Sequence, residues 1–271
     1  MALIDLIEVS KKFGEKIILT EANFSVNEKE RIAIIGKNGG GKSTLMKILR
    51  GECEIDSGRV IRQNSISIEM LAQTPRFDDR LSVKDALNYE LKEIFDARDE
   101  YESVLAQISN EHDNPELLHR QDELVKFIES KDGWNIENKI ERILDSFGLR
   151  EYENRLVNSL SGGEIRRVAL GALILKKPDV LLLDEPTNHL DVYMVRFLEE
   201  LLLSSNQTIV FISHDRYFID RLATRSVEIE DGGLRSFEGG YANYLTKKEE
   251  ILRSLAKSHE TLIKNLKSEE E

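Results

Sequence analysis

The residues with the clearest chemical meaning lie between positions 36 and 44. Two glycines separated by four residues are followed by Lys42 and Ser43, which is the pattern of a phosphate-binding loop. The apolar run at 32–35 predicts a buried strand before the loop, and 45–49 predicts the first turns of a helix after it. This order directs backbone amides and the positive end of a helix dipole at one anion. The stretch therefore predicts a nucleotide site, with Lys42 on the β- and γ-phosphates and Ser43 on Mg²⁺.

A pair of carboxylates follows a short, continuous apolar run. Residues 180–183 predict a strand buried on both faces, and Asp184 and Glu185 come directly after it. Because ligands of open α/β sheets lie beyond the carboxyl ends of the strands, these side chains suit Mg²⁺ binding and activation of a water. His214 follows a second buried run, at 207–212, and is expected at the same edge. A structural, hydrogen-bonding histidine is the alternative for His214.

Three further positions could contact the same ligand, although each has a plainer explanation. Gln73 ends a predicted strand, where a surface glutamine is the alternative. The sequence Leu-Ser-Gly-Gly-Glu at 160–164 precedes a predicted helix at 165–175, so Ser161 occupies an N-cap position. An ordinary helix cap would explain that serine equally well. For Phe13, spacing alone favours simple packing of the ring in the core.

The overall composition limits the classes of protein. The chain has 271 residues, which is enough for one large domain or two small ones. A formal net charge of −12 argues against a broad basic face for nucleic acid. With one cysteine, Cys53, no internal disulfide can form. No apolar run approaches the roughly 20 residues that span a bilayer, so we expect no membrane insertion and a cytoplasmic location.

From Ser82 the pattern changes to helical periodicity. Apolar residues recur at spacings of three, four and seven up to Ile108, which predicts one amphipathic helix capped by Ser82. A turn at 110–115, ending in a proline, and a second apolar stripe predict an antiparallel helical hairpin. Gly133 is expected to break the second helix, and 134–147 predicts a third.

The remaining expected strands lie outside this helical region. They are residues 3–9, 22–26, 58–62 and 66–71, and a hairpin at 225–238. The set predicts an α/β fold with a mixed sheet around the helix of the phosphate-binding loop. An antiparallel β portion is expected near the N-terminus, and a helical subdomain at about 82–178.

The tail from Tyr241 is polar and predicts a helix. A spacing of three and four residues marks a seam of two heptads, formed by Leu252, Leu255, His259, Leu262 and Leu266. Between Lys247 and Lys267 there are six basic residues and three acidic ones. Two heptads are marginal alone, so the helix implies a partner helix. A solvated helix that folds back on the core is the alternative.

In their order along the chain, these motifs resemble the Walker A, Q-loop, signature, Walker B and switch-histidine motifs of ABC ATPases. Three segments are similar to the ABC-F branch: 184–191, 213–216 with Phe218, and 239–244. The short helical insertion resembles the Uup-like group of that branch. Members of the branch lack membrane domains and carry two ABC domains joined by a helical linker, and many act on ribosomes. Since one ABC domain is present, we expect the N-terminal ABC domain and the start of the linker of a longer protein.

The resemblance implies a role for each motif residue. Phe13 would stack on adenine, and Gln73 would contact Mg²⁺ and the attacking water. Asp184 would hold Mg²⁺ through water, Glu185 would act as general base, and His214 would contact the γ-phosphate. The expected catalytic residues are therefore Glu185, His214 and Gln73, and the expected metal ligands are Ser43, Gln73 and Asp184. The expected nucleotide-binding residues are Phe13, Gly36, Asn38, Gly39, Gly40, Gly41, Lys42, Ser43, Thr44, Ser161, Gly162, Gly163 and Asp191.

The resemblance also implies cofactors and partners. ATP and Mg²⁺ are expected, with an ABC domain at 1–245 and a charged linker helix at 246–271. Ser161 and Gly163 would close on the γ-phosphate of a facing domain, so a second ABC domain, in cis or from a second copy, would complete the site. The isolated domain would hydrolyse ATP weakly, and the linker could contact the ribosome or nucleic acid. Two alternatives are the ATP-binding subunit of a membrane transporter and a non-catalytic module that recognises ribosomal RNA or branched DNA.

Overall fold

The chain divides into two compact units. The computed structural model describes residues 2–71, 75–109 and 114–269, and the side chains of Leu255 and residues 257–269 are not described. The bounds of the first unit are Met1–Ile66, Leu182–Glu185 and Leu202–Glu271, and those of the second are Ser67–Leu181 and Pro186–Leu201. Most of the residues predicted to contact the nucleotide and Mg²⁺ belong to the first unit. Gln73, Asp191 and the 160–164 motif belong to the second.

The N-terminal part of the first unit is an antiparallel sheet of three strands. β1 (Ala2–Phe13) lies between β2 (Lys16–Asn27) and β4 (Ser57–Arg62). The expected antiparallel portion is thus present, but β1 and β2 are much longer than the strands predicted at 3–9 and 22–26. Shifts of register interrupt the pairing of β1, and Glu8 and Glu21 have φ values of 51° and 43°. Such bulges disturb the alternation of buried and exposed residues by which a strand is recognised.

A second, mixed sheet carries the strands that end at the candidate site. Its order is β5-β6-β7-β3-β8-β9. The strands are β3 (Arg31–Gly36), β5 (Ile68–Met70), β6 (Val180–Asp184), β7 (Thr208–Ile212), β8 (Arg225–Glu230) and β9 (Gly233–Glu238). β3 pairs in parallel with β7 and β8, whereas β8 and β9 are antiparallel. Every residue of β6 and β7 is buried, which explains why the sequence of each strand is a continuous apolar run. The predicted mixed α/β fold is confirmed.

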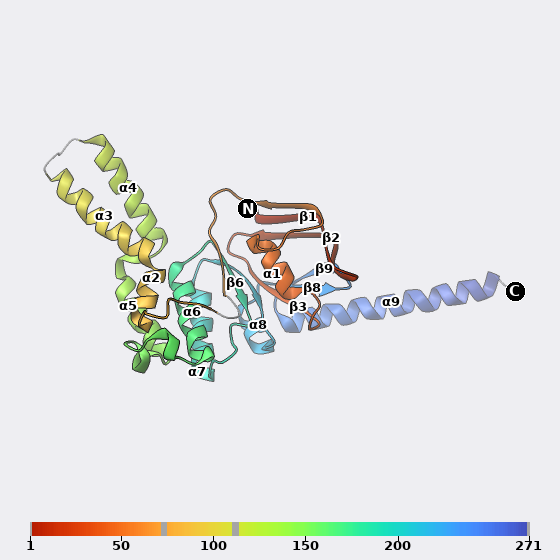
Figure 1. Cartoon of the computed structure of the whole chain (residues 1–271). Helices are drawn as coiled ribbons and strands as arrows, with labels where there is room; N and C mark the ends of the chain where they lie inside the picture. The colour runs from red at the N-terminus through yellow and green to blue at the C-terminus, as the bar shows by residue number, and fades with distance from the viewer. Residues whose placement is uncertain (1, 72–74, 110–113, 270–271) are drawn as a thin grey trace. The chain divides into compact units, whose positions relative to one another are not determined.

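Nine α-helices occur in the described part of the chain (Figure 1). They are α1 (Lys42–Arg50), α2 (Val83–Glu90), α3 (Lys92–Ile108), α4 (Pro115–Ser130), α5 (Ile136–Ser146), α6 (Gly162–Lys176), α7 (Val192–Ser204), α8 (Arg216–Leu222) and α9 (Tyr241–Glu269). The single helix predicted from Ser82 to Ile108 is wrong, because the chain turns at Leu91 and forms α2 and α3. Three short 3₁₀ turns lie at Gly133–Asn135, Arg150–Tyr152 and Val157–Ser159.

The helical hairpin of the second unit is built as the apolar stripes predicted. Its core contains Ala97 and Val104 of α3 and Leu124 and Ile128 of α4, and Tyr101 packs against them. Figure 1 shows the two helices side by side. Pro115 is the first residue of α4, as expected, and Asn114 caps the helix. Gly133 also ends the hairpin where the sequence predicted a break.

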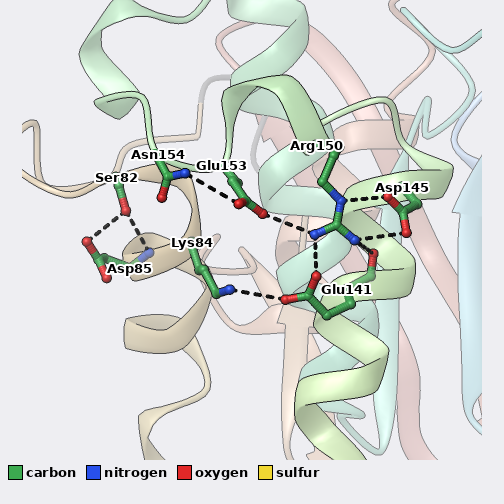
Figure 2. Close-up of polar contacts among 8 residues, drawn as sticks. All are labelled: Ser82, Lys84, Asp85, Glu141, Asp145, Arg150, Glu153 and Asn154. Carbon is green, nitrogen blue, oxygen red and sulfur yellow. Dashed lines mark hydrogen bonds and ion pairs between the residues drawn. The ribbon is translucent and has the colours of Figure 1, made fainter.

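An arginine joins three segments of the second unit (Figure 2). The Arg150 guanidinium donates two hydrogen bonds to Asp145 at 2.7 and 2.9 Å, and further bonds to Glu141 and Glu153. Lys84 of α2 donates to the same Glu141 at 3.1 Å. The network therefore connects α2, α5 and the turn at Arg150–Tyr152. Its hydrogen bonds hold the pKa values of Glu141 and Asp145 below their ordinary values.

Replacing Arg150 by methionine should lower the melting temperature by only about 1 to 4 °C, because exposed ion pairs are screened by solvent. The loss should be larger at low salt than at high salt. Since the acids have lowered pKa values in the folded state, the stabilisation is present at neutral pH and is lost as pH falls through those values. Thermal unfolding measured at pH 7 and in acid checks this. Arg76→Met is the control, because Arg76 is exposed and belongs to the same unit. Equal melting at pH 7 and low salt for parent and Arg150→Met would contradict the prediction.

The first turns of α9 are fastened to the mixed sheet. The Tyr244 hydroxyl donates to the buried Glu228 of β8 at 2.6 Å, and Lys248 donates to the same carboxylate. Burial, and then the bond to Glu228, raise the pKa of Tyr244 to about 12. Glu228 is the register partner of Ile35 in β3, the strand before the phosphate-binding loop. The base of α9 is thus fixed to the strand beside β3.

The helix predicted from Tyr241 is present, and it continues through position 245 without a break. The expected boundary between an ABC domain at 1–245 and a linker helix at 246–271 stays a prediction. In the predicted seam, Leu252 is exposed, whereas the other four seam side chains lie outside those described.

Candidate active site

The loop between β3 and α1 has the geometry that its glycines predicted. Gly41, the N-cap of α1, has a φ of 101°, and a Cβ built there would lie 2.6 Å from Cγ2 of Ile18. A Cβ on Gly36 would lie 2.6 Å from the carbonyl oxygen of Ile229. Both contacts are too short for any side chain, so the loop coils closely against β2 and β8. The first turn of α1 contains no acidic residue, which leaves its N-terminus suited to an anion.

Lys42 folds back on this loop. Its ammonium donates hydrogen bonds to the carbonyl oxygens of Gly36 at 2.8 Å and Lys37 at 3.0 Å. Burial lowers the pKa of Lys42, while the nearby charges of Glu185 and Asp184 act in the opposite direction. Hydrogen bonds between ionised partners are stronger than those to neutral carbonyls. A phosphate oxygen would therefore be a better acceptor for this ammonium than either carbonyl.

Ser43 and Asp184 bring two oxygen ligands together. The Ser43 hydroxyl donates to Oδ2 of Asp184 at 2.7 Å, and Asp184 is the buried last residue of β6. Mg²⁺ prefers oxygen ligands and commonly uses one or two carboxylates with substrate phosphates. In the described part of the chain, no group of three or more His, Cys, Asp or Glu could hold a metal ion. As oxygen donors, Ser43 and Asp184 fit a Mg²⁺ ion that is held jointly with phosphates.

Glu185 is held in an unusual backbone conformation next to His214. Its φ of 52° is in the left-handed region, and its N–H donates to the carbonyl of Ile212 in β7 at 2.9 Å. The backbone N–H of His214 donates to Oε2 of Glu185 at 3.2 Å, and Nε2 lies 3.4 Å from Oε1. Burial raises the pKa of Glu185, and the charge of His214 opposes that effect. A carboxylate with a raised pKa suits a general base, and strained backbone is often found at functional sites.

Phe13 does not pack in the core. Its side chain is 53% exposed, so the packing explanation is wrong. The ammonium of Lys11 lies 5.0 Å from the ring centroid and is held by an ion pair with Asp56 at 3.0 Å. An exposed aromatic ring with a cation over it can accept a flat, aromatic ligand such as a base.

Several predicted residues belong to the second unit. The cap expected at Ser161 is present, with Glu164 completing a capping box. A Cβ on Gly163 would lie 3.4 Å from Cβ of His189, and Asp191 accepts a bond from the N–H of Met194 at 2.9 Å. Roles in nucleotide binding for the residues in this unit, Ser161, Gly162, Gly163 and Asp191, stay predictions. Gln73 lies outside the described residues.

The structure thus gathers five of the predicted residues at one edge of the first unit: Lys42, Ser43, Asp184, Glu185 and His214. Two neighbours were missed. Ile229 supports the loop, and no local sequence pattern marks it, because its role depends on the pairing of β8 with β3. The ammonium nitrogen of Lys16 would lie 3.4 Å from a Cβ built on Gly39. The sequence marks Lys16 only by its position three residues after Phe13.

A family model described as ABC transporter matches residues 19–188. The chain therefore belongs to the ABC transporter family, which the order of its motifs had indicated. ABC domains of this family bind ATP with Mg²⁺ and work with a second ABC domain.

Curated relatives place the chain within that family. The ATP-binding protein Uup of Haemophilus influenzae is 38% identical over 270 residues, which cover 100% of this chain and 41% of the relative. Uup of Escherichia coli is 39% identical over 93% of this chain and 39% of its own length. The energy-dependent translational throttle protein EttA of Haemophilus influenzae is 38% identical over 87% of this chain and 42% of its own. The predicted resemblance to the ABC-F branch is confirmed, and the chain spans about two fifths of the length of these relatives.

Solved structures show the same fold. An ATP-binding subunit of an ABC transporter matches with a TM-score of 0.65 and 18% identity, over 87% of this chain and 90% of that one. CbiO1 from Clostridium perfringens, part of the transporter complex CbiONQ, matches with a TM-score of 0.59 and 22% identity, over 94% of both chains. Among the described residues, no helix combines the length and the apolar character needed to cross a membrane.

Proposed function

We propose that this chain binds MgATP and hydrolyses it as one ABC domain of a two-domain, ABC-F-type factor that acts in translation. The observation that carries the proposal is the contact between Ser43 and Asp184, with Lys42 and Glu185 beside it. The translational role is supported by relatives, among which EttA is named a translational throttle protein. The transporter alternative has no comparable support, because the transporter structures match at 18 to 22% identity.

The residues of the first unit would share the work as follows. Lys42 and the amides of the loop hold the phosphates, and Phe13 stacks on adenine. Ser43 and Asp184 would hold Mg²⁺, and the ion would supply charge neutralisation at the phosphates. Glu185 takes a proton from the attacking water, and His214 positions Glu185 and contacts the γ-phosphate. Since phosphoryl transfer needs little covalent help, positioning and charge neutralisation would supply most of the rate.

The proposal includes the expected partners. Ser161 and Gly163 would complete the site of a facing ABC domain, and Gln73 and Asp191 would contribute to nucleotide binding. Residues 1–245 would form the ABC domain, and 246–271 a linker helix that contacts the ribosome or nucleic acid. Such a factor would act in the cytoplasm, where ribosomes work.

The direct test is titration of the chain with MgATP in a calorimeter, together with measurement of phosphate release. We expect binding with a dissociation constant of about 1 μM to 1 mM and slow hydrolysis that depends on Mg²⁺. If two copies pair around ATP, the rate per molecule should rise with protein concentration. Absence of any heat of binding, in a folded sample, would overturn the proposal.

Co-sedimentation with ribosomes tests the partner. With the two-domain protein, we expect more binding with a non-hydrolysable ATP analogue than without nucleotide. Ribosome binding that is the same with and without nucleotide, and that falls steeply with salt, would instead favour the non-catalytic module that recognises nucleic acid. Co-purification with a membrane protein would favour the transporter subunit.

A further inference from the structure

We infer that Lys16 is a second phosphate-binding cation of this site, which contacts the nucleotide between the base and the phosphate-binding loop. The inference rests on the proposed function. Lys16 is the first residue of β2 and the register partner of Phe13 in β1. A Cβ built on Gly39 would lie 3.4 Å from its ammonium nitrogen. The cation therefore lies between the candidate adenine platform and the loop.

The charge of Lys16 is available to a ligand. Within the described residues, its ammonium makes no hydrogen bond or ion pair, and its side chain is exposed. Lys11, on the same hairpin, is instead engaged by Asp56. Lys42 is bonded to two loop carbonyls. Of these three lysines, Lys16 alone could bind an anion without first giving up a partner.

The place of Lys16 indicates which phosphates it contacts. Gly39 lies in the middle of the loop, whereas Ser43, which bonds to Asp184, lies in the first turn of α1, where Mg²⁺ and the γ-phosphate are proposed. A contact on the base side of the loop would serve ATP and ADP alike. Because the ammonium is a compact charge on a flexible stem, a small movement would bring it onto a phosphate oxygen.

The test compares Lys16→Met with the parent chain, using MgATP, MgADP and adenosine as ligands in calorimetric competition. We expect Lys16→Met to weaken binding of MgATP and MgADP equally, by about three- to tenfold, which is the range for a partly exposed charged contact. Adenosine binding should not change, and the loss should shrink at high salt. Lys12→Met is the matched control, an exposed lysine on the same hairpin, and should change each affinity by less than about twofold.

The outcomes separate the inference from the function on which it rests. If the parent binds neither nucleotide, the proposed function fails. If the parent binds both and Lys16→Met binds them equally well, the role of Lys16 is wrong and the proposed function stands. An equal loss of adenosine binding would show a disturbed hairpin and would also overturn the inference. Lys16→Arg, which keeps the charge, should restore affinity to within about twofold of the parent.

Discussion

Lys42→Met is expected to lower the affinity for MgATP by about 100-fold or more, because it removes charged hydrogen bonds that are each worth about 1.5–3 kcal/mol. The buried ammonium lies against the loop carbonyls of Gly36 and Lys37 and close to Asp184. Calorimetric titration with MgATP gives the result directly.

The same variant should remain folded. Burial lowers the pKa of Lys42, so its charged form carries a desolvation cost in the nucleotide-free protein. An apolar side chain of similar length avoids that cost but also loses the attraction to Asp184 and Glu185, so the melting temperature should change by no more than a few degrees. Lys47→Met is the control, since Lys47 is an exposed lysine on the same helix, α1. ATP affinity within threefold of the parent would remove Lys42 from the proposed site.

Glu185→Gln should reduce hydrolysis by about 100-fold or more, the usual contribution of a general base, while ATP affinity stays within about threefold. The amide keeps the shape of the side chain and can still accept a bond from the N–H of His214. Single-turnover phosphate release, with the protein in excess over ATP, measures the chemical step. Glu54→Gln, at an exposed position of the same unit, is the control. Unchanged single-turnover hydrolysis in Glu185→Gln would exclude Glu185 as the base.

The pH dependence of hydrolysis gives a second readout for Glu185. A base must be ionised, and burial raises the pKa of this carboxyl. Activity should therefore be full above the raised pKa and should fall as pH decreases through it. This fall in the hydrolysis rate should begin at a higher pH than for an ordinary glutamate. The residual hydrolysis rate of Glu185→Gln should not show the same fall. An identical acid limb in both proteins would assign the titration to another group.

The phosphate-binding loop and the carboxylates could be predicted because their chemistry is local. Glycines are needed where the loop approaches β2 and β8, and the continuous burial of β6 places Asp184 at a strand end. Both features leave a signature within a few residues. The partners of these residues are less predictable: Ile229 supports the loop from a strand almost 200 residues later in the chain.

The break between α2 and α3 shows a different limit. Leu91 is buried and keeps the apolar stripe in phase, and its N–H still bonds to the carbonyls of Leu87 and Asn88. No glycine or proline marks the turn, so the periodicity alone predicted one helix. The strands predicted for β1 and β2 were too short for a related reason. The alternation of apolar and polar residues fails at the bulges at Glu8 and Glu21, where an extra residue is inserted.

Because Tyr244 and Lys248 bond to Glu228, the base of α9 must move together with the first unit. A helix of 29 residues is about 43 Å long at 1.5 Å per residue. Since its base is fixed to the strand beside β3, a rotation of the first unit by about 5° would displace the far end of a straight helix by about 4 Å. Small angular changes at the nucleotide would thus become movements the size of an atom's diameter or more at a distant contact.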